Sequence, residues 1–365
     1  MLLLGSLYRR ALRPFLFLLD PETAHHLALG LLAWVPALAA LRDPPELAQR
    51  LWNIEFSNPL GLAAGMDKDA RAVGAWQALG FGFAELGTVT PRPQAGNDRP
   101  RIWRLNKERG LINRLGFPSE GIEGLEGRLR RLRGAPNLNM RIALNFGPNK
   151  STPTEGIIED YRSLMERLSP LADFIVINLS SPNSPGLRDW QAPEQMRTLF
   201  SAISSVRRMG GAARVNAGTH NRPPVLVKLA PDLEPNQLEE LCATMVDLGL
   251  DGVVATNTTI ARSEIGVRSE LPGGISGQPL KLKARSVIRS VHKLTRGRIP
   301  IIGAGGVATA DDAFAHIQAG ASLVELYTAM IFEGPTLPAE IKSGLCGLLK
   351  RDGFRSIGEA VGTGT

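Results

Sequence analysis

The 365-residue chain has few of the residues that build metal and disulfide sites. Its two cysteines, Cys242 and Cys346, lie far apart in segments with helical spacing. Such spacing fits neither a metal site nor an iron–sulfur cluster. The five histidines also lack ligand spacing. We therefore expect no bound metal, and two buried thiols in a reducing compartment.

Aromatic residues are scarce as well, at 5% of the chain. The net charge of +7 could suit nucleic acid, anionic lipid or an acidic small molecule. However, no nucleic-acid-binding motif accompanies this charge, and the charged runs are typical of solvated helix faces. We therefore expect no nucleic-acid partner.

What the chain does have is a regular alternation of short apolar runs with helical segments. The apolar runs lie at 60–64, 82–86, 141–144, 173–177, 224–229, 252–255, 299–302 and 321–326. Helical segments lie near 69–79, 120–133, 154–168, 193–209, 236–248, 279–294, 310–319 and 336–350. Eight alternations predict a (β/α)8 TIM barrel, an α/β fold of about 250 residues with room left for an extension. An open doubly wound sheet is the alternative.

Polar residues follow nearly every apolar run. In residues 174–188 (FIVINLSSPNSPGLR), an apolar run stops at Asn178 and leads into a proline-stiffened loop that carries Ser181 and Asn183. A barrel brings all eight strand ends to one face, whereas an open sheet scatters them. The convergence of amides, hydroxyls and lysines favours the barrel.

Two glycine-rich segments stand out. Residues 303–306 (GAGG) end the seventh run, and a helix start follows at Thr309. Bare backbone amides beside a helix N-terminus bind phosphate, and TIM barrels favour phosphate at this position. Residues 273–277 (GGISG) could add a second wall or form a flexible loop.

The N-terminus differs from the rest. Residues 1–19 are basic and apolar, residues 27–41 are almost wholly apolar, and neither run is long enough to cross a bilayer. Asp20-Pro21-Glu22-Thr23 predicts a helix start. We expect two short amphipathic helices in the membrane interface, with their arginines toward lipid headgroups. A cleaved signal peptide or a hairpin docked on the barrel are the alternatives.

Several motifs resemble those of the dihydroorotate dehydrogenases. They are NPLGLAAGMDK (58–68), ELGTVTPRPQAGNDRPR (85–101), INRLGF (112–117), INLSSPNSPGLR (177–188), VKLAPD (227–232), ATNTT (255–259), GGISGQPL (273–280), IIGAGG (301–306) and LYTAM (326–330). The resemblance extends in order from about residue 7 to about residue 350. The N-terminal helices, and Ser181 where the soluble class carries cysteine, resemble the membrane-associated, quinone-dependent class 2.

The resemblance implies an FMN that dihydroorotate reduces and that ubiquinone or menaquinone reoxidises. Ser181 matches the catalytic base. The flavin positions match Ala64, Gly65, Met66, Asp67, Lys68, Thr88, Asn145, Asn178, Lys228, Thr256, Gly277, Gly306, Tyr327 and Thr328. The substrate positions match Lys68, Asn113, Arg114, Leu115, Gly116, Phe117, Asn178, Asn183, Asn257 and Thr258. The quinone tunnel positions match His25, Arg104 and Tyr327.

These roles agree with simple chemistry. Asparagines both donate to and accept from a cyclic imide such as dihydroorotate, and a lysine adds positive charge for its carboxylate. A serine hydroxyl is a weak base and needs a relay, yet no histidine or acid lies in its motif. Lys228 would stabilise the negative charge that forms on flavin reduction.

The predicted organisation is a helical extension at 1–45, a flavin and substrate barrel at 46–350, and a flexible tail at 351–365. Residues 207–222 are predicted to form a long loop. We expect a monomer at the cytoplasmic face of a bacterial inner membrane, or otherwise at the mitochondrial inner membrane. Two other functions remain open: a sugar-phosphate aldolase with Lys68 or Lys228 as its Schiff-base amine, and a non-catalytic membrane scaffold.

Overall fold

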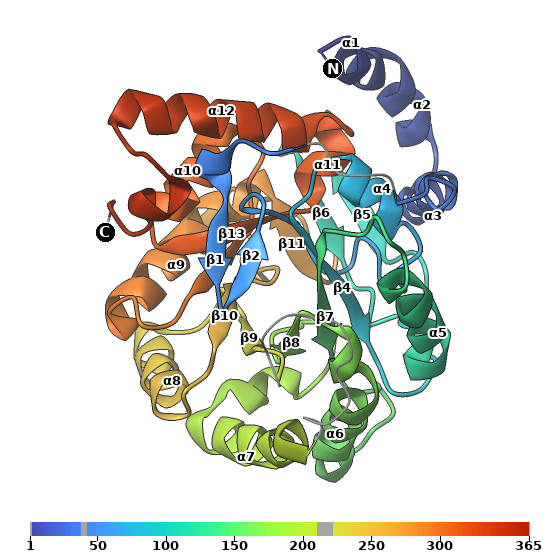
Figure 1. Cartoon of the computed structure of the whole chain (residues 1–365). Helices are drawn as coiled ribbons and strands as arrows, with labels where there is room; N and C mark the ends of the chain where they lie inside the picture. Colours follow the sequence, from blue (N-terminus) through green and yellow to red (C-terminus); the bar gives the residue numbers. More distant parts are fainter. Residues whose placement is uncertain (1, 38–41, 210–221, 365) are drawn as a thin grey trace.

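The computed structural model describes residues 2–37, 42–209 and 222–364, and its centre is a closed parallel barrel (Figure 1). The strand order around the barrel is β10-β12-β13-β3-β4-β7-β8-β9, and β9 pairs with β10 to close it. The strands are β3 (Leu60–Leu62), β4 (Phe83–Val89), β7 (Arg141–Phe146), β8 (Phe174–Asn178), β9 (Val225–Leu229), β10 (Gly252–Ala255), β12 (Ile301–Ala304) and β13 (Ala321–Leu326). Every predicted apolar run overlaps one of these strands, so the TIM barrel is confirmed and the open sheet is wrong.

A helix follows each barrel strand and covers the outside. These helices are α4 (Val73–Ala78), α5 (Gly121–Arg133), α6 (Ile157–Leu168), α7 (Pro193–Met209), α8 (Pro235–Asp247), α9 (Lys281–Thr295), α10 (Ala310–Gln318) and α12 (Leu337–Asp352). In α6 the buried residues Tyr161, Leu164, Met165 and Leu168 follow helical spacing. This stripe packs on the barrel while the polar side faces outward, as amphipathic periodicity requires.

An antiparallel hairpin that the apolar runs did not predict covers the amino-terminal end of the barrel strands. It consists of β1 (Gln49–Leu51) and β2 (Ile54–Phe56). The Phe56 ring lies 5.8 Å from that of Phe83 and 6.1 Å from that of Phe174, centroid to centroid. The barrel interior is therefore filled with apolar side chains at this end, and chemistry is confined to the other.

A small antiparallel sheet lies at the open end. It pairs β5 (Ile102–Leu105) with β6 (Gly110–Asn113) and β6 with β11 (Gly274–Gly277). The glycine-rich segment at 273–277 is therefore mostly a strand rather than a flexible loop.

The N-terminal segment forms two helical arms beside the barrel (Figure 1). The first combines α1 (Leu2–Leu7), a π-helical turn (Tyr8–Leu12) and α2 (Arg13–Leu18), and the second is α3 (Pro21–Leu32). The Asp20 carboxylate caps α3 by accepting hydrogen bonds from the N–H groups of Glu22 and Thr23, which confirms the predicted helix start. No helix in the described ranges has the length and apolar character of a membrane span.

Two arginines predicted to face lipid headgroups bind the barrel instead. The Arg9 guanidinium lies 3.4 Å from the Glu340 carboxylate, and Arg13 donates a 2.8 Å hydrogen bond to the carbonyl of Phe332. The prediction is wrong for both because acceptors of the barrel lie within their reach. Apolar side chains point outward from the arms, and we refer to this set as the apolar face: Leu7, Leu12, Phe15, Leu18, Leu27, Leu31 and Trp34.

The C-terminal segment also differs from its prediction. After α12, a 3₁₀ turn (Ile357–Ala360) buries Ile357 and Ala360 completely, and the N–H groups of Gly362 and Gly364 bond to the carbonyls at the end of α10. The predicted flexible tail is therefore a docked segment. Two buried apolar residues and two backbone hydrogen bonds hold it, and so few contacts leave no apolar pattern in the sequence. The loop predicted at 207–222 lies almost entirely outside the described residues.

The attachment of α3 is predicted to depend on Glu22. Its carboxylate binds Arg101 at 2.6 Å and Arg99 at 3.1 Å, and both Glu22 and Arg101 are almost fully buried. Burial opposes ionisation, but the Arg101 hydrogen bond and the two arginine charges lower the pKa of Glu22 to about 2. Glu22→Gln leaves Arg101 buried without its counter-charge, so the free energy of unfolding should fall by about 3–5 kcal/mol.

Because the folded pKa of Glu22 is depressed, the carboxylate stabilises the fold fully above its ordinary pKa, and this stabilisation is lost as pH falls toward 2. Denaturant unfolding of both proteins across this pH range should show the difference between them shrinking in acid. Glu55→Gln, which removes an exposed ion pair with Arg50, should change stability by less than about 0.5 kcal/mol. Equal stability of Glu22→Gln and the wild type at neutral pH would contradict the role of this ion pair.

Candidate active site

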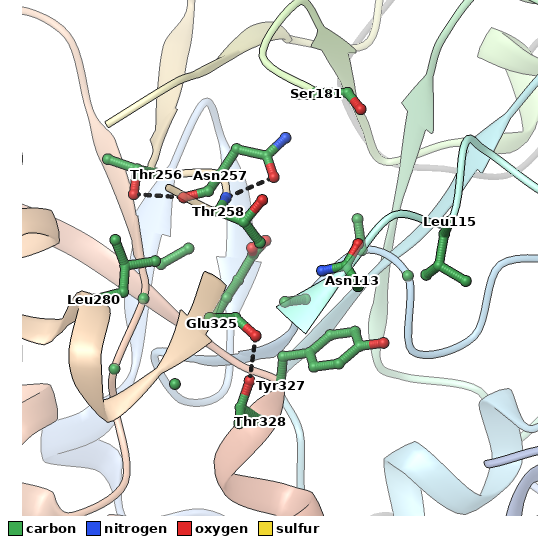
Figure 2. A pocket seen from close by; sticks show the side chains of 18 of the residues that line it. Asn113, Leu115, Ser181, Thr256, Asn257, Thr258, Leu280, Glu325, Tyr327 and Thr328 are labelled. Atoms are coloured by element: carbon green, nitrogen blue, oxygen red, sulfur yellow. Dashed lines mark hydrogen bonds between the residues drawn. The ribbon is translucent and has the colours of Figure 1, made fainter. Parts of the chain in front are cut away.

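A deep cavity opens at the carboxyl end of the barrel strands (Figure 2). It encloses about 1160 Å³, including space open to solvent, which suits a cofactor and a small substrate together. In Figure 2, Asn257 and Thr258 lie on one side and Asn113 and Leu115 on the other. Most of the predicted site residues line it: Ala64, Gly65, Lys68, Thr88, Asn113, Leu115, Gly116, Phe117, Asn178, Ser181, Asn183, Lys228, Thr256, Asn257, Thr258, Gly277, Gly306, Tyr327 and Thr328.

The floor of the cavity is a polar layer on top of an apolar one. Each strand turns alternate side chains inward, so the residue two positions beyond an apolar one also faces the axis. The lower layer includes Phe83, Ala143, Val176, Leu226 and Leu323. The same alternation carries the layer above: Glu85, Asn145, Asn178, Lys228 and Glu325. Polar chemistry therefore begins one step above the packed core.

Asparagines are linked to one another around the cavity. The Asn178 amide donates to Thr88 Oγ1 at 3.0 Å, and the Asn257 amide donates to Ser180 Oγ at 2.9 Å. Asn183 donates to the backbone carbonyl of Asn113 at 3.2 Å. Because these bonds fix each amide, the remaining donors and acceptors are held in place for a ligand.

Ser181 is buried in the wall of the cavity, in the loop after β8. Its Oγ accepts a 3.2 Å hydrogen bond from the N–H of Asn183. Within the part of the chain that the structure describes, no carboxylate or imidazole is hydrogen-bonded to this hydroxyl. The geometry therefore matches the sequence, which offers no acid or histidine to activate the serine.

Lys68 brings positive charge to the side of the cavity near α3. Its Nζ donates to the carbonyl of Gly65 at 2.9 Å, and burial lowers its pKa. Burial, and then the charge of Lys68, lower the pKa of His25 to about 3, so His25 is neutral at pH 7. Burial raises the pKa of Tyr327 to about 12, with a further contribution from Glu22. These effects connect the cavity electrostatically to α3.

A second lysine lies in the floor, between two glutamates. Lys228 Nζ is 2.8 Å from Glu85 Oε2 and 3.4 Å from Glu325 Oε2. Burial favours the neutral lysine, but the charges of the carboxylates outweigh it and raise the pKa of Lys228. Lys228 is therefore an ammonium in contact with the cavity.

The glycine loop after β12 forms another wall. Gly305 and Gly306 have positive φ angles, and a Cβ on Gly306 would lie 2.4 Å from that of Lys281 in α9. Only glycine fits, so the backbone itself faces the cavity. Among the described residues, the N–H groups of Gly305 and Gly306 have no hydrogen-bond partner. This wall suits a phosphate group, and a flavin mononucleotide would fit the site.

Six predicted site residues do not line the cavity. The Asp67 carboxylate accepts hydrogen bonds from the N–H groups of Arg71 and Ala72 in the loop before α4, and Asn145 lies below the cavity, where it donates to Glu85 and accepts from Asn178. The remaining four are Met66, Arg114, His25 and Arg104.

Arg114 and Arg104 point away from the cavity toward backbone carbonyls. Arg114 contacts the carbonyl of Pro100 at 3.3 Å and lies over the Trp103 ring. Arg104 donates to the carbonyl of Leu19 at 2.8 Å and lies 4.6 Å from the centre of the Phe17 ring. Arg104 therefore joins β5 to the end of α2.

Glu85 and Glu325 were not among the predicted site residues. Both lie within strands that are otherwise mostly apolar, FAELGTV and ASLVEL. A glutamate in a strand buried on both faces is costly unless it is paired. A glutamate inside a buried apolar strand was therefore the sequence feature that could have indicated a functional role for Glu85 and Glu325. Arg109 and Glu333, which pair at the rim of the cavity, gave no such signal because charged side chains are ordinary at partly exposed positions.

Comparisons with known proteins agree with this site. The sequence profile of the family described as dihydroorotate dehydrogenase matches residues 46–349. A dihydroorotate dehydrogenase (quinone) of Deinococcus deserti is 44% identical, over 98% of this chain and 99% of that protein. One from Anaeromyxobacter sp. is 46% identical, over 96% of each.

A solved structure is similar along nearly the whole chain. The crystal structure of DHODH from Eimeria tenella in complex with ferulenol has a TM-score of 0.89 and 38% identity, and the match covers 94% of this chain and 95% of that one. By sequence, fold and cavity, the chain belongs to the quinone-dependent branch of the dihydroorotate dehydrogenase family.

Proposed function

We propose that the cavity binds FMN and dihydroorotate together and that its own residues perform the oxidation known for the family. The chain oxidises dihydroorotate with a quinone as the final acceptor, in pyrimidine biosynthesis. The observation that carries the proposal is the meeting of the asparagines, the Lys228 ammonium and the glycine loop in one cavity. When bound, the flavin supplies the chemistry that accepts hydride and passes electrons to quinone.

The cofactor would be held by backbone and charge. The free N–H groups of Gly305 and Gly306 would bind its phosphate, and Lys228 would face the ring system and stabilise negative charge there. Gly65, Thr88, Thr256, Gly277 and Thr328 line the space between these two anchors.

The substrate would be held by the asparagines. Asn113, Asn178, Asn183 and Asn257 can donate to its carbonyls and accept from its N–H groups, and Lys68 can pair with its carboxylate. Their amide orientations are fixed by hydrogen bonds to neighbours, so little order has to be gained on binding.

Ser181 would take the proton from C5 of dihydroorotate while hydride leaves C6. As the hydroxyl accepts that proton it must release its own. Since no carboxylate or imidazole is bonded to it within the described chain, a threonine hydroxyl of the cavity or water would take that proton.

The quinone would enter between the N-terminal arms. Tyr327 lines the cavity, and His25 and Arg104 lie toward the arms. The apolar face, on which Phe15, Leu18 and Trp34 are 70%, 83% and 88% exposed, supports peripheral attachment to a membrane. A monomer that binds ubiquinone or menaquinone at the cytoplasmic face of a bacterial inner membrane fits these features.

Of the two lysines considered for an aldolase mechanism, Lys68 and Lys228, Lys228 has less support. A Schiff-base amine must be neutral to attack, whereas two carboxylates hold Lys228 as an ammonium.

Two half-reactions test this function. Purified protein in detergent should carry FMN, identified by mass spectrometry after release. Anaerobic dihydroorotate should bleach the flavin absorption, and a ubiquinone analogue should restore it, because both substrates share one cofactor. Protein without flavin would contradict the proposal, and bleaching without recovery would contradict the quinone entrance.

Ser181→Ala removes the proposed base without changing the cavity wall. The rate of flavin reduction by dihydroorotate should fall by about 10²–10⁴-fold, the range for loss of a general base, while FMN content stays at the wild-type level. Stopped-flow absorbance gives this rate. Ser184→Ala in the same loop, whose side chain does not line the cavity, should react normally. A normal rate in Ser181→Ala would assign the proton transfer to another group.

Arg104→Ala removes the guanidinium that binds the carbonyls at the end of α2. Loss of these charged hydrogen bonds, each worth about 1.5–3 kcal/mol, should loosen the entrance and raise the quinone KM by at least tenfold. The dihydroorotate KM should not change. Lys107→Ala, in the exposed turn after β5, is the control. Steady-state kinetics, with each substrate varied in turn, measures both KM values. A rise in the dihydroorotate KM alone would place Arg104 outside the quinone entrance.

A further inference from the structure

Three ionisable side chains form a buried cluster under the cavity. Glu85 on β4, Lys228 on β9 and Glu325 on β13 are 0%, 5% and 2% exposed. Lys228 contacts both carboxylates, at 2.8 Å and 3.4 Å. Lys228 and Glu325 both line the cavity. The cluster is thus in position to influence whatever occupies the cavity.

The charges of this cluster do not balance if every group is ionised. Two carboxylates and one ammonium carry a net charge of −1 among side chains that are almost fully buried. An uncompensated buried charge is expensive, so such a group changes its protonation state instead. Two acids that interact this closely share one proton between them. The cluster should therefore contain one neutral carboxylic acid.

The hydrogen bonds favour Glu325 as the acid. Glu85 accepts hydrogen bonds from Lys228 and from the amide of Asn145, and both stabilise its ionised form. Glu325 has the longer contact with Lys228, and its Oε1 has no partner within the described chain. Burial and the charge of Glu85 raise the pKa of Glu325 well above its ordinary value, whereas Lys228 lowers that of Glu85 against the effect of burial.

Within the described ranges, no other charged group acts on Glu325. The strands that flank β13 are β3 (LGL) and β12 (IIGA), and neither has an ionisable side chain. Across the barrel axis, the charged groups that act on Glu325 are Glu85 and Lys228. The side chain that faces it from β7, Asn145, is neutral.

We propose that Glu325 is a positioning residue that holds a proton in the floor of the cavity, so that the cluster with Glu85 and Lys228 is neutral beneath the cofactor. This inference rests on the proposed flavin site. When reduced, a bound cofactor would carry additional negative charge, and a neutral cluster would not repel that charge. Glu325 would keep its proton, since the proposed acceptors are Ser181 for the C5 proton and the cofactor for the hydride.

Glu325→Gln and Glu85→Gln form a matched pair of variants. Glutamine imitates the neutral acid in shape and charge, so Glu325→Gln should leave the flavin reduction potential at neutral pH unchanged. If Glu325 were ionised, its replacement would remove a negative charge beneath the cofactor and raise the potential. Spectroelectrochemical titration of the holoenzyme measures this shift, and a raised potential would overturn the proposal.

Two further measurements do not depend on the flavin. Infrared difference spectra of wild type minus Glu325→Gln should contain the carbonyl band of a protonated carboxyl, and absence of that band would overturn the proposal. Thermal unfolding should assign the proton: Glu85→Gln, which removes the ionised partner of two donors, should lower the midpoint more than Glu325→Gln. The reverse order would place the proton on Glu85. Protein that lacks flavin but has the band would contradict the proposed function and leave the protonated acid established.

Discussion

Inside the barrel, every second side chain of a strand faces the axis, so a layer of polar side chains lies directly on a layer of apolar ones. The active site depends on this stacking of the two layers. Phe83 and Leu226 fill the axis, while Glu85 and Lys228, two residues later on the same strands, belong to the polar layer, in which Lys228 reaches the cavity. The hairpin that carries Phe56 closes the opposite end. Because the lower interior is packed, the polar side chains above it cannot collapse inward, and they stay where a cofactor and substrate can meet them.

The N-terminal arms are tied to this barrel by charge more than by apolar packing. Glu22 binds two arginines of the segment before β5, Arg104 reaches back to the carbonyls of α2, and Arg9 pairs with Glu340. With Arg9 and Arg13 bound to the barrel, the arms present mainly apolar side chains outward. A basic, apolar N-terminus can thus place its charges inward and its hydrophobic side chains outward, which composition alone does not show.

Local patterns were enough to predict most of the fold and much of the site. The eight apolar runs end in polar residues, and closure of the barrel brings those ends together, so Asn178, Ser181 and Asn257 could be expected in one cavity. The unpredicted parts depend on contacts distant in sequence. The sheet of β5, β6 and β11 joins segments some 160 residues apart, and Arg114 and Arg104 turn toward carbonyls that only the folded chain brings near. The role proposed for Glu325 likewise depends on its contact with Lys228 and on the nearby Glu85, which lie on other strands.

The small sheet at the cavity mouth joins an N-terminal arm to the cavity. Arg104 on β5 pairs in register with Leu111 on β6, and Asn113 lies two residues farther along the same strand. Arg104 binds the carbonyls at the end of α2, whereas Asn113 lines the cavity. Because β5 and β6 are hydrogen-bonded to each other, a displacement of α2 would reach the Asn113 amide through these two strands.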